Sequence, residues 1–283
     1  MLKTRIITAL VLLAILLPAL FASSPLPFAL LTLVLIAAAG WEWSRLNGAP
    51  GLPAWGMGLG LAALCAASLQ WLGLQAAPAW CWWLGGAIWV LGGAQALRSG
   101  PSHWPQISRG LRLGLGVLAL WAAWLAMAQA KAVGINFLLS IFSLVWMADV
   151  AAYFGGRSLG RRKLAPAISP GKSWEGVWSG MVAVLLLGFL WAYVIDQRLA
   201  VDSASLYQRL LHGQGLAIGV LALLFLSAMS VVGDLFESLI KRAVGAKDSS
   251  QLLPGHGGVL DRVDALLPVF PLAMALASLG APA

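Results

Sequence analysis

Residues 215–234 read GLAIGVLALLFLSAMSVVGD, a stretch of apolar and small residues whose only charge is an aspartate at its end. In an α-helix, about 20 such residues span the roughly 30 Å core of a lipid bilayer. Backbone polar groups in lipid must be paired within the segment, so this stretch is predicted to be a transmembrane helix. It decides the fold class, because similar stretches recur along the whole chain.

The composition extends this interpretation to the rest of the chain. Its 283 residues are 60% hydrophobic and only 10% charged, which is unlike ordinary globular domains. Lys3 and Arg5 ahead of the first apolar run also fit a cleaved signal peptide, but the next run follows almost at once, which favours a retained helix. We therefore expect an all-α polytopic membrane protein with about nine transmembrane helices. The expected spans are roughly residues 5–22, 27–44, 54–75, 79–98, 111–129, 135–154, 177–195, 215–234 and 264–281.

The basic residues predict the topology. If the N-terminus is cytoplasmic and the spans alternate, all 18 Lys and Arg residues except Lys131, Arg198 and Arg209 fall on the cytoplasmic side. This distribution favours a cytoplasmic N-terminus and a C-terminus on the opposite side. The two large polar loops, residues 156–176 and 236–263, then face the cytoplasm. The net charge of +8 follows from this topology and does not indicate a nucleic-acid partner.

The distribution of polar residues divides the chain by function. Residues 1–133 are nearly all apolar span and are expected to form an N-terminal scaffold of about five helices. Residues 134–283 contain most of the acidic residues and both large loops. They are expected to form a catalytic transmembrane region of about four helices.

The segment that follows residue 234 gathers ionisable groups at one membrane surface. Residues 238–264 read SLIKRAVGAKDSSQLLPGHGGVLDRVD, with lysines, arginines and aspartates around a His256-Gly257-Gly258 turn. Cations suit phosphates and carboxylates suit metal ions, so this mixture predicts a site for both. The histidine would either orient a phosphate or satisfy the turn.

Helical spacing places four polar residues on one face. Asp234, Glu237, Ser238 and Lys241 follow i, i+3, i+4 and i+7 spacing. Such a face in a membrane helix forms either the wall of a site or a polar contact between helices, and we favour the site.

A pair of aspartates precedes the last apolar run. Asp261 and Asp264 lie three residues apart, so in a helix both carboxylates would point the same way and could bind a divalent cation. If the backbone is not helical there, Asp264 is only an N-cap.

Two upstream features add to the predicted site. Asp149 lies in an apolar span, where a carboxylate is costly and needs a partner. It would serve either a metal or phosphate site or a structural pair with an arginine. The stretch SPGKS, residues 169–173, offers Lys172 as a point charge and hydroxyls for a phosphate. It is not a Walker A loop, since Pro166 stands where that pattern needs glycine. The alternative is that Ser173 simply begins the next helix, at a terminus suited to anions.

Together these positions resemble the signature of the phosphatidate cytidylyltransferases, also called CDP-diacylglycerol synthases. The resemblance is strong from about residue 146 to residue 264 and only topological before that. One departure is Val150-Ala151, where the family pattern has a small or hydroxyl residue followed by glycine. The matching positions are Asp149, Ala152-Tyr153, Gly156-Arg157, Lys163 to Pro166, Ser169 to Ser173, Glu175-Gly176, Ser238, Lys241-Arg242, Lys247-Asp248, Pro254, His256 to Gly258, Asp261-Arg262 and Asp264.

The resemblance implies that CTP and phosphatidic acid react to CDP-diacylglycerol and pyrophosphate, in a multi-pass protein of the bacterial inner membrane whose active site faces the cytoplasm. It implies Mg²⁺, with a second, monovalent cation such as K⁺ as an option, and a homodimer among membrane lipids. The implied catalytic residues are Asp234, Lys241, Asp248, Asp261 and Asp264, and the implied metal ligands are Asp149, Asp234, Asp261 and Asp264. The implied substrate-binding residues are Lys172, Ser173, Arg242, Lys247, His256, Gly257, Gly258 and Arg262.

Two other functions stay open at this point. One is a related enzyme that acts on another lipid phosphate or nucleotide, such as an ether-lipid or polyprenyl version. The other is a transporter in which Asp149 and Asp234 serve an ion pathway. Transporters place such groups near the bilayer midplane, between broken helices, whereas here the charges gather at one surface.

Overall fold

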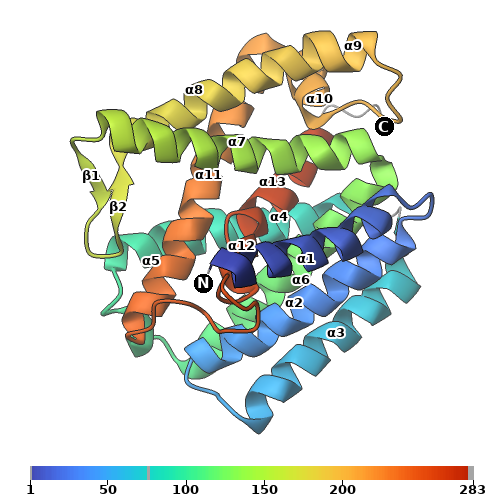
Figure 1. Cartoon of the computed structure of the whole chain (residues 1–283). Helices are drawn as coiled ribbons and strands as arrows, with labels where there is room; N and C mark the ends of the chain where they lie inside the picture. Colours follow the sequence, from blue (N-terminus) through green and yellow to red (C-terminus); the bar gives the residue numbers. More distant parts are fainter. Residues whose placement is uncertain (1, 75–76, 280–283) are drawn as a thin grey trace.

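The computed structural model describes residues 2–74 and 77–279, and nearly all of them are helical (Figure 1). This confirms the expected all-α class, with one short β-hairpin as an addition. The helices are α1 (Leu2–Phe21), α2 (Leu26–Leu46), α3 (Leu52–Leu72), α4 (Ala79–Ala87), α5 (Ala94–Ser99), α6 (Arg109–Val133), α7 (Ile135–Leu159), α8 (Trp174–Leu190), α9 (Asp196–Arg198), α10 (Leu206–Gly213), α11 (Leu216–Ala243), α12 (Leu260–Val263) and α13 (Leu266–Ser278), and the strands are β1 (Lys163–Ala165) and β2 (Ser169–Ser173).

Seven of the described helices are long and apolar enough to cross a membrane, fewer than the roughly nine expected. The two other expected spans are also helical but less regular. Helices α4 and α5 are joined by a π-helical stretch, Ile88–Gly93, and α13 has only 13 residues. The chain is therefore a multi-pass membrane protein, whereas the side that each loop faces stays a prediction.

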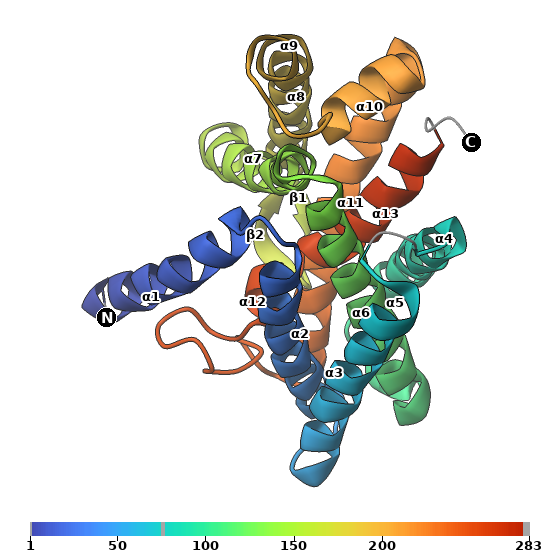
Figure 2. The ribbon, with the colours of Figure 1, turned by 90° about the vertical axis from the view of Figure 1, so that its right-hand side faces the viewer.

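Helices α7 and α8 form one closely packed pair, and α2 packs against α3 and α6 (Figures 1 and 2). Helix α11 contacts α7, α8, α10 and α13. Glycines explain the approach of α7 to α8. A Cβ atom at Gly180 would lie 2.8 Å from the carbonyl oxygen of Ala148, and one at Gly176 would lie 2.7 Å from that of Ala152. The absence of side chains at these positions lets the two helix backbones touch.

The hairpin between α7 and α8 replaces what the sequence suggested was only a loop. Strands β1 and β2 are antiparallel, and Lys163 pairs with Ser173. The chain then enters α8 directly, where the Ser173 hydroxyl accepts a hydrogen bond from the Gly176 amide at 3.2 Å. The carboxylate of Glu175 accepts hydrogen bonds from the Arg161 amide at 3.0 Å and the Arg162 amide at 3.1 Å. These contacts fix the hairpin on the start of α8.

A polar cluster closes the opposite end of α7. The Asp202 carboxylate accepts hydrogen bonds from the amides of Ile135 at 2.6 Å and Asn136 at 2.9 Å. These are the first two residues of the helix, so Asp202 pairs amides that have no partner within it. Burial raises the pKa of Asp202, but the hydrogen bonds from these amides outweigh it and the net shift is downward.

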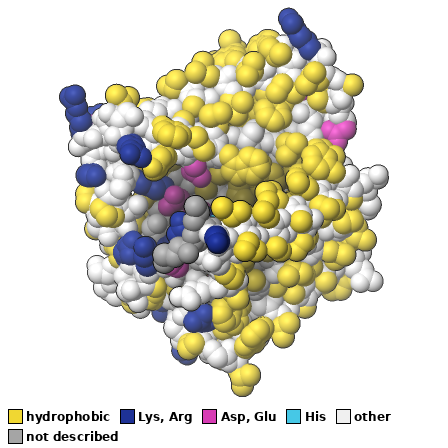
Figure 3. Space-filling model, in the orientation of Figure 1, with side chains coloured by type: hydrophobic (Ala, Val, Ile, Leu, Met, Phe, Trp, Pro, Cys, Tyr) yellow, Lys and Arg dark blue, Asp and Glu magenta, His cyan; other side chains and the backbone are white. Residues whose placement is uncertain are grey.

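The surface separates apolar from charged regions. Figure 3 shows apolar side chains over much of one face and most of its Lys and Arg side chains toward one end, beside a hollow where acidic side chains are visible. The exposed apolar side chains include Val34, Leu59, Leu186 and Leu221. An apolar surface of this extent suits contact with lipid.

Candidate active site

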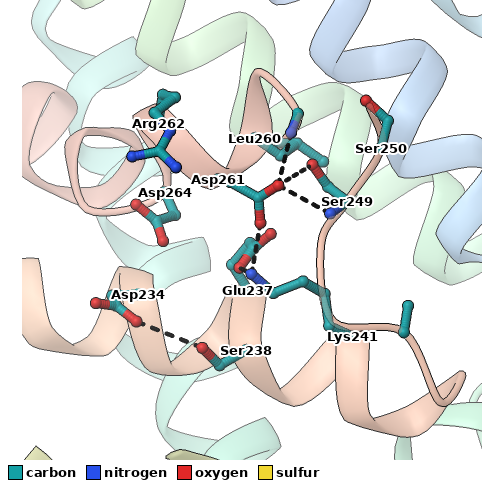
Figure 4. A network of polar contacts seen from close by, with 12 residues as sticks. Asp234, Glu237, Ser238, Lys241, Ser249, Ser250, Leu260, Asp261, Arg262 and Asp264 are labelled. Atoms are coloured by element: carbon teal, nitrogen blue, oxygen red, sulfur yellow. Dashed lines mark hydrogen bonds and ion pairs between the residues drawn. The ribbon is translucent and has the colours of Figure 1, made fainter. Parts of the chain in front are cut away.

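The charged end of α11 forms one wall of the site (Figure 4). Asp234, Glu237, Ser238 and Lys241 lie on one face of this helix, as their spacing predicts. The Ser238 hydroxyl donates to the Asp234 carboxylate at 3.4 Å. One turn further on, Lys241 forms an ion pair with Glu237, and both side chains are almost buried. Phe236, on another face, packs on Trp43, Trp89 and Trp104, which fixes the rotation of the helix.

Asp261 joins α11 to the loop that follows it. One carboxylate oxygen lies 2.5 Å from the ammonium of Lys241. The other accepts hydrogen bonds from the amide and hydroxyl of Ser249, both at 2.9 Å, and from the Gly258 amide at 2.7 Å. Burial raises the pKa of Asp261, but these hydrogen bonds, led by that from Lys241, outweigh it and lower the pKa to about 2. The group is therefore a fixed anion at neutral pH.

The aspartates at 261 and 264 do not point the same way, which corrects one expectation. The backbone is helical as far as Asp264, but the two carboxylates have different partners. Asp261 faces Ser249 and Lys241, whereas Asp264 lies on the side of Asp234 (Figure 4). The Asp264 carboxylate accepts a hydrogen bond from the adjacent Ala265 amide at 2.7 Å.

The hairpin brings a lysine to the carboxylates of α11. The ammonium of Lys172 lies 2.6 Å from the Asp234 carboxylate. Lys172 also lies within electrostatic range of Asp149 on α7 and of Asp264. Segments far apart in the sequence thus meet around one ammonium group.

A cavity of about 530 Å³ opens beside this lysine. Helices α7, α8 and α11 and strand β2 all contribute to its walls. Small residues on α7 and α8 leave the space, and charged and aromatic side chains line it. The lining residues are Asp149, Ala152, Tyr153, Gly156, Arg157, Gly171, Lys172, Ser173, Gly176, Val177, Val231 and Asp234.

The structure places Lys247 and Asp248 elsewhere. Both line a second cavity of about 730 Å³, with Arg45 and the segment from Ser249 to Gln251. The two cavities share no lining residue. The sequence prediction had grouped all of these charges together, and the fold separates them into two cavities.

Two predicted phosphate-binding arginines contact backbone carbonyl groups instead. Arg242 donates to the carbonyls of Ile168 and Ala246, both at 3.3 Å, and so connects α11 to the hairpin. Arg262 donates to the carbonyl of His256 at 3.0 Å. Both side chains belong to exposed residues, so they remain accessible to an anion.

The His256-Gly257-Gly258 turn is shaped by its surroundings. Gly257 has φ of +86°, which favours glycine, and a Cβ atom there would lie 2.7 Å from the Asp261 carboxylate. The His256 amide donates to the Leu253 carbonyl at 2.8 Å. The imidazole Nδ1 is buried and has no hydrogen-bond partner among the described residues.

Two acidic residues near the site were not among the predicted site residues. Glu237, although noted on the α11 face, was given no role, and its carboxylate is buried against Lys241. Glu42 on α2 is fully buried and contacts the loop that carries the signature. The sequence does point to Glu42, because a carboxylate inside an apolar span needs a polar partner.

The residues present are compatible with a bound cation. In the part of the chain that the structure describes, no three His, Cys, Asp or Glu side chains converge closely enough to hold a metal as they stand. Yet carboxylates outnumber the ammonium groups of Lys172 and Lys241 in this connected cluster, so added positive charge would be favourable. The carboxylates concerned are Asp149, Asp234, Glu237, Asp261 and Asp264.

Comparisons with known proteins identify the family to which the chain belongs. The model of the cytidylyltransferase family matches residues 3–279. The phosphatidate cytidylyltransferase of Pseudomonas aeruginosa is 39% identical over 291 residues, which cover 100% of both chains. That of Haemophilus influenzae is 49% identical over 138 residues, 49% of this chain and 44% of the relative. That of Thermotoga maritima is 40% identical over 134 residues, 47% of this chain and 46% of the relative. The family resemblance read from the signature is thereby confirmed, and the chain belongs to the cytidylyltransferase family.

Proposed function

We propose that this protein transfers CMP from CTP to phosphatidic acid and releases pyrophosphate, giving CDP-diacylglycerol for phospholipid synthesis. The observation that carries this proposal is the cavity at the α7–α8 pair, which is lined by the cations Lys172 and Arg157 and the carboxylates Asp149 and Asp234, with Lys172 paired to Asp234. Full-length similarity to phosphatidate cytidylyltransferases supports the same reaction.

The chemistry needs charge more than it needs a base. A phosphate monoester has its second pKa near 6, so the attacking oxygen of phosphatidate is already largely anionic at neutral pH. That oxygen attacks the α-phosphorus of CTP, and the bond to pyrophosphate breaks. The remaining task is to bring two anions together and to stabilise the leaving group, which positive groups do by position and charge. Lys172 and Lys241, each paired with a carboxylate, are proposed for this role, with Arg242 and Arg262 as further cations and Lys247 at the second cavity.

Magnesium completes this charge balance in the proposed mechanism. When bound, it would neutralise phosphate oxygens and stabilise the leaving group. Asp234, Asp261 and Asp264 are the proposed ligands, with Asp149 beside them, and K⁺ is the option for a second cation. In the structure these carboxylates hold lysine ammonium groups, Asp234 with Lys172 and Asp261 with Lys241. A bound Mg²⁺ would therefore share these carboxylates with the two lysines or displace the lysines from them.

The surroundings of the cavity fit a lipid substrate. Tyr153 and Trp178, on or next to its walls, are exposed apolar residues of α7 and α8. A lipid headgroup in the cavity would leave its acyl chains along this apolar surface. We place the site at the cytoplasmic side of a bacterial inner membrane, where CTP is available, and we expect a homodimer.

The test is transfer of label from CTP to a lipid in detergent. Purified protein would receive phosphatidic acid, Mg²⁺ and radiolabelled CTP. We expect label in the lipid fraction, and loss of that label with EDTA and in Asp261→Asn. Absence of label from folded wild-type protein, with phosphatidate and polyprenyl phosphate both tried, would contradict the proposal. Transport would instead require sealed vesicles, whereas nucleotidyl transfer persists in detergent.

A further inference from the structure

A fully buried carboxylate surrounded by hydrogen-bond donors lies outside the proposed catalytic set. Glu42 is on α2, in the N-terminal half, and has 0% exposure. Its four hydrogen-bond donors all come from the signature loop, more than 200 residues later. They are the Ser249 hydroxyl at 3.2 Å, the Ser250 hydroxyl at 2.5 Å, the Val259 amide at 2.9 Å and the Leu260 amide at 2.7 Å.

These donors place Glu42 at the start of α12, the helical turn that carries Asp261. The amides of Val259 and Leu260 have no partner within the turn, and Glu42 accepts from both. Bonds from amides to an ionised carboxylate are stronger than bonds between neutral groups. A buried carboxylate also requires such donors, because it would otherwise be left without solvation. Helix α2 and the catalytic turn therefore hold each other in place.

A second contact links Glu42 to Asp261 through the hydroxyl of Ser249. The Ser249 hydroxyl lies within hydrogen-bond distance of both carboxylates, at 3.2 Å from Glu42 and 2.9 Å from Asp261. Gly258 lies between them, and a Cβ atom there would stand 2.0 Å from the Ser249 hydroxyl and 2.3 Å from the Glu42 carboxylate. The second glycine of the His-Gly-Gly turn is thus required by the close approach of Glu42.

We propose that Glu42 is a positioning residue of the active site, which holds the signature loop so that Asp261 meets Lys241 and Asp264 lies beside Asp234. The effect on turnover rests on the proposed function, whereas the effect on the loop does not. The negative charge of Glu42 is essential to this role. In Glu42→Gln one oxygen becomes an NH₂ group, which must face at least one backbone amide, and two donors cannot pair.

The first measurement is amide hydrogen exchange of the full-length protein in detergent. We expect Glu42→Gln to accelerate exchange in residues 247–262 while the other helices keep wild-type rates. The matched control is Thr32→Val on the same helix, a buried residue whose hydroxyl bonds only to Phe28 and Ala29 of α2. Unchanged exchange in residues 247–262, or equal acceleration in the control, would overturn the proposal.

The second measurement is the Mg²⁺ dependence of cytidylyl transfer. Loss of an outer partner typically costs roughly 10- to 100-fold in metal affinity or activity. We expect Glu42→Gln to raise the half-saturating Mg²⁺ concentration or lower kcat by that factor, with Thr32→Val near wild type. A variant with wild-type kcat and Mg²⁺ response would refute the positioning role. If the wild type transfers no CMP but the exchange result holds, the proposed function fails and the loop contact stands.

A less disruptive variant keeps the test possible if Glu42→Gln misfolds. Ser250→Ala removes one of the four donors and leaves both amide bonds to Glu42. We expect faster exchange confined to the same loop, by a smaller factor than in Glu42→Gln. If Glu42→Gln does not fold, the exchange rates of Ser250→Ala alone test the proposal. Wild-type exchange in residues 247–262 of this variant would then count against it.

Discussion

At the level of single residues, Lys172 links two parts of the site that the sequence keeps 62 positions apart. Its ammonium lies on the Asp234 carboxylate at 2.6 Å and at the edge of the cavity. We expect Lys172→Ala to reduce the rate of CMP transfer by roughly 100-fold, because a fixed charge that stabilises the transition state is lost. Initial rates of label transfer from CTP provide the measurement.

The same hairpin offers the matched control. Lys163 is also a lysine of the hairpin, but its residue is exposed and it does not line the cavity. Lys163→Ala should keep near-wild-type transfer. Equal losses in both variants would show that the hairpin needs positive charge in general and that Lys172 has no special role.

Asp202 allows a residue-scale test of stability against pH. Its pKa is lowered because hydrogen bonds from the Asn136 and Ile135 amides outweigh the effect of burial. The stabilisation by a lowered carboxyl pKa is present above the unfolded value, near 4, and is lost as the pH falls through the folded value. Asp202→Ala should therefore lower the free energy of unfolding by about 1 kcal/mol at pH 7.

The pH dependence separates this effect from simple loss of a side chain. The difference in Tm between Asp202→Ala and wild type should shrink as the pH is lowered below about 4. Gln197→Ala, an exposed change in the neighbouring α9, should show no such trend. A difference that is constant from pH 7 to pH 3 would refute the assignment.

At the level of elements, contact between α7 and α8 depends on glycine. In Gly180→Ala the new methyl group would approach the Ala148 carbonyl, so the helices must separate. Such overpacking costs about 1–3 kcal/mol, and it should also reduce transfer, since Asp149 lies on α7 and Ser173 caps the start of α8. Thermal unfolding in detergent is the measurement. Gly60→Ala on α3, where nothing lies within 4 Å, should be neutral or stabilising.

The elements also show which parts of the fold the sequence could predict. Apolar length identified α2, α6, α7 and α11, because each must pair its own backbone in lipid. The β-hairpin was not predicted. Its strands have only three and five residues, and it is held by tertiary contacts such as that of Arg242 with Ile168. The π-helical stretch between α4 and α5 likewise has no periodic signal in the sequence.

At the scale of the whole molecule, the signature predicted the residues of the site better than their arrangement. Spacing placed Asp234 and Lys241 on one face, because a helix sets that relation locally. It could not place Lys247 and Asp248 in a separate cavity, since this depends on how the loop folds back on α2. It also could not pair Glu42 with Val259, 217 positions away.

Topology is a whole-molecule prediction that labelling can check. Both native cysteines, Cys65 and Cys81, are buried and so give a low background. Cysteines would be introduced singly at Ala167 in the hairpin and at Ala200, both exposed. On intact cells an impermeant thiol reagent should label Ala200→Cys and leave Ala167→Cys unlabelled until the membrane is opened. The opposite pattern would invert the orientation.

The bond from Glu42 to the loop before α12 also has a consequence for biosynthesis. The ribosome makes α2 early and the segment from Ser249 to Leu260 much later. The Glu42 carboxylate therefore has none of these hydrogen-bond donors until the later segment has been made. Domains generally fold as units, and contacts distant in sequence form late. A chain whose translation stops after α11 would contain Lys172, Lys241 and most of the membrane helices, yet it would lack the turn that carries Asp261. We therefore expect chains that stop before this turn to be inactive, so that cytidylyl transfer begins only when the last residues of the loop have been made.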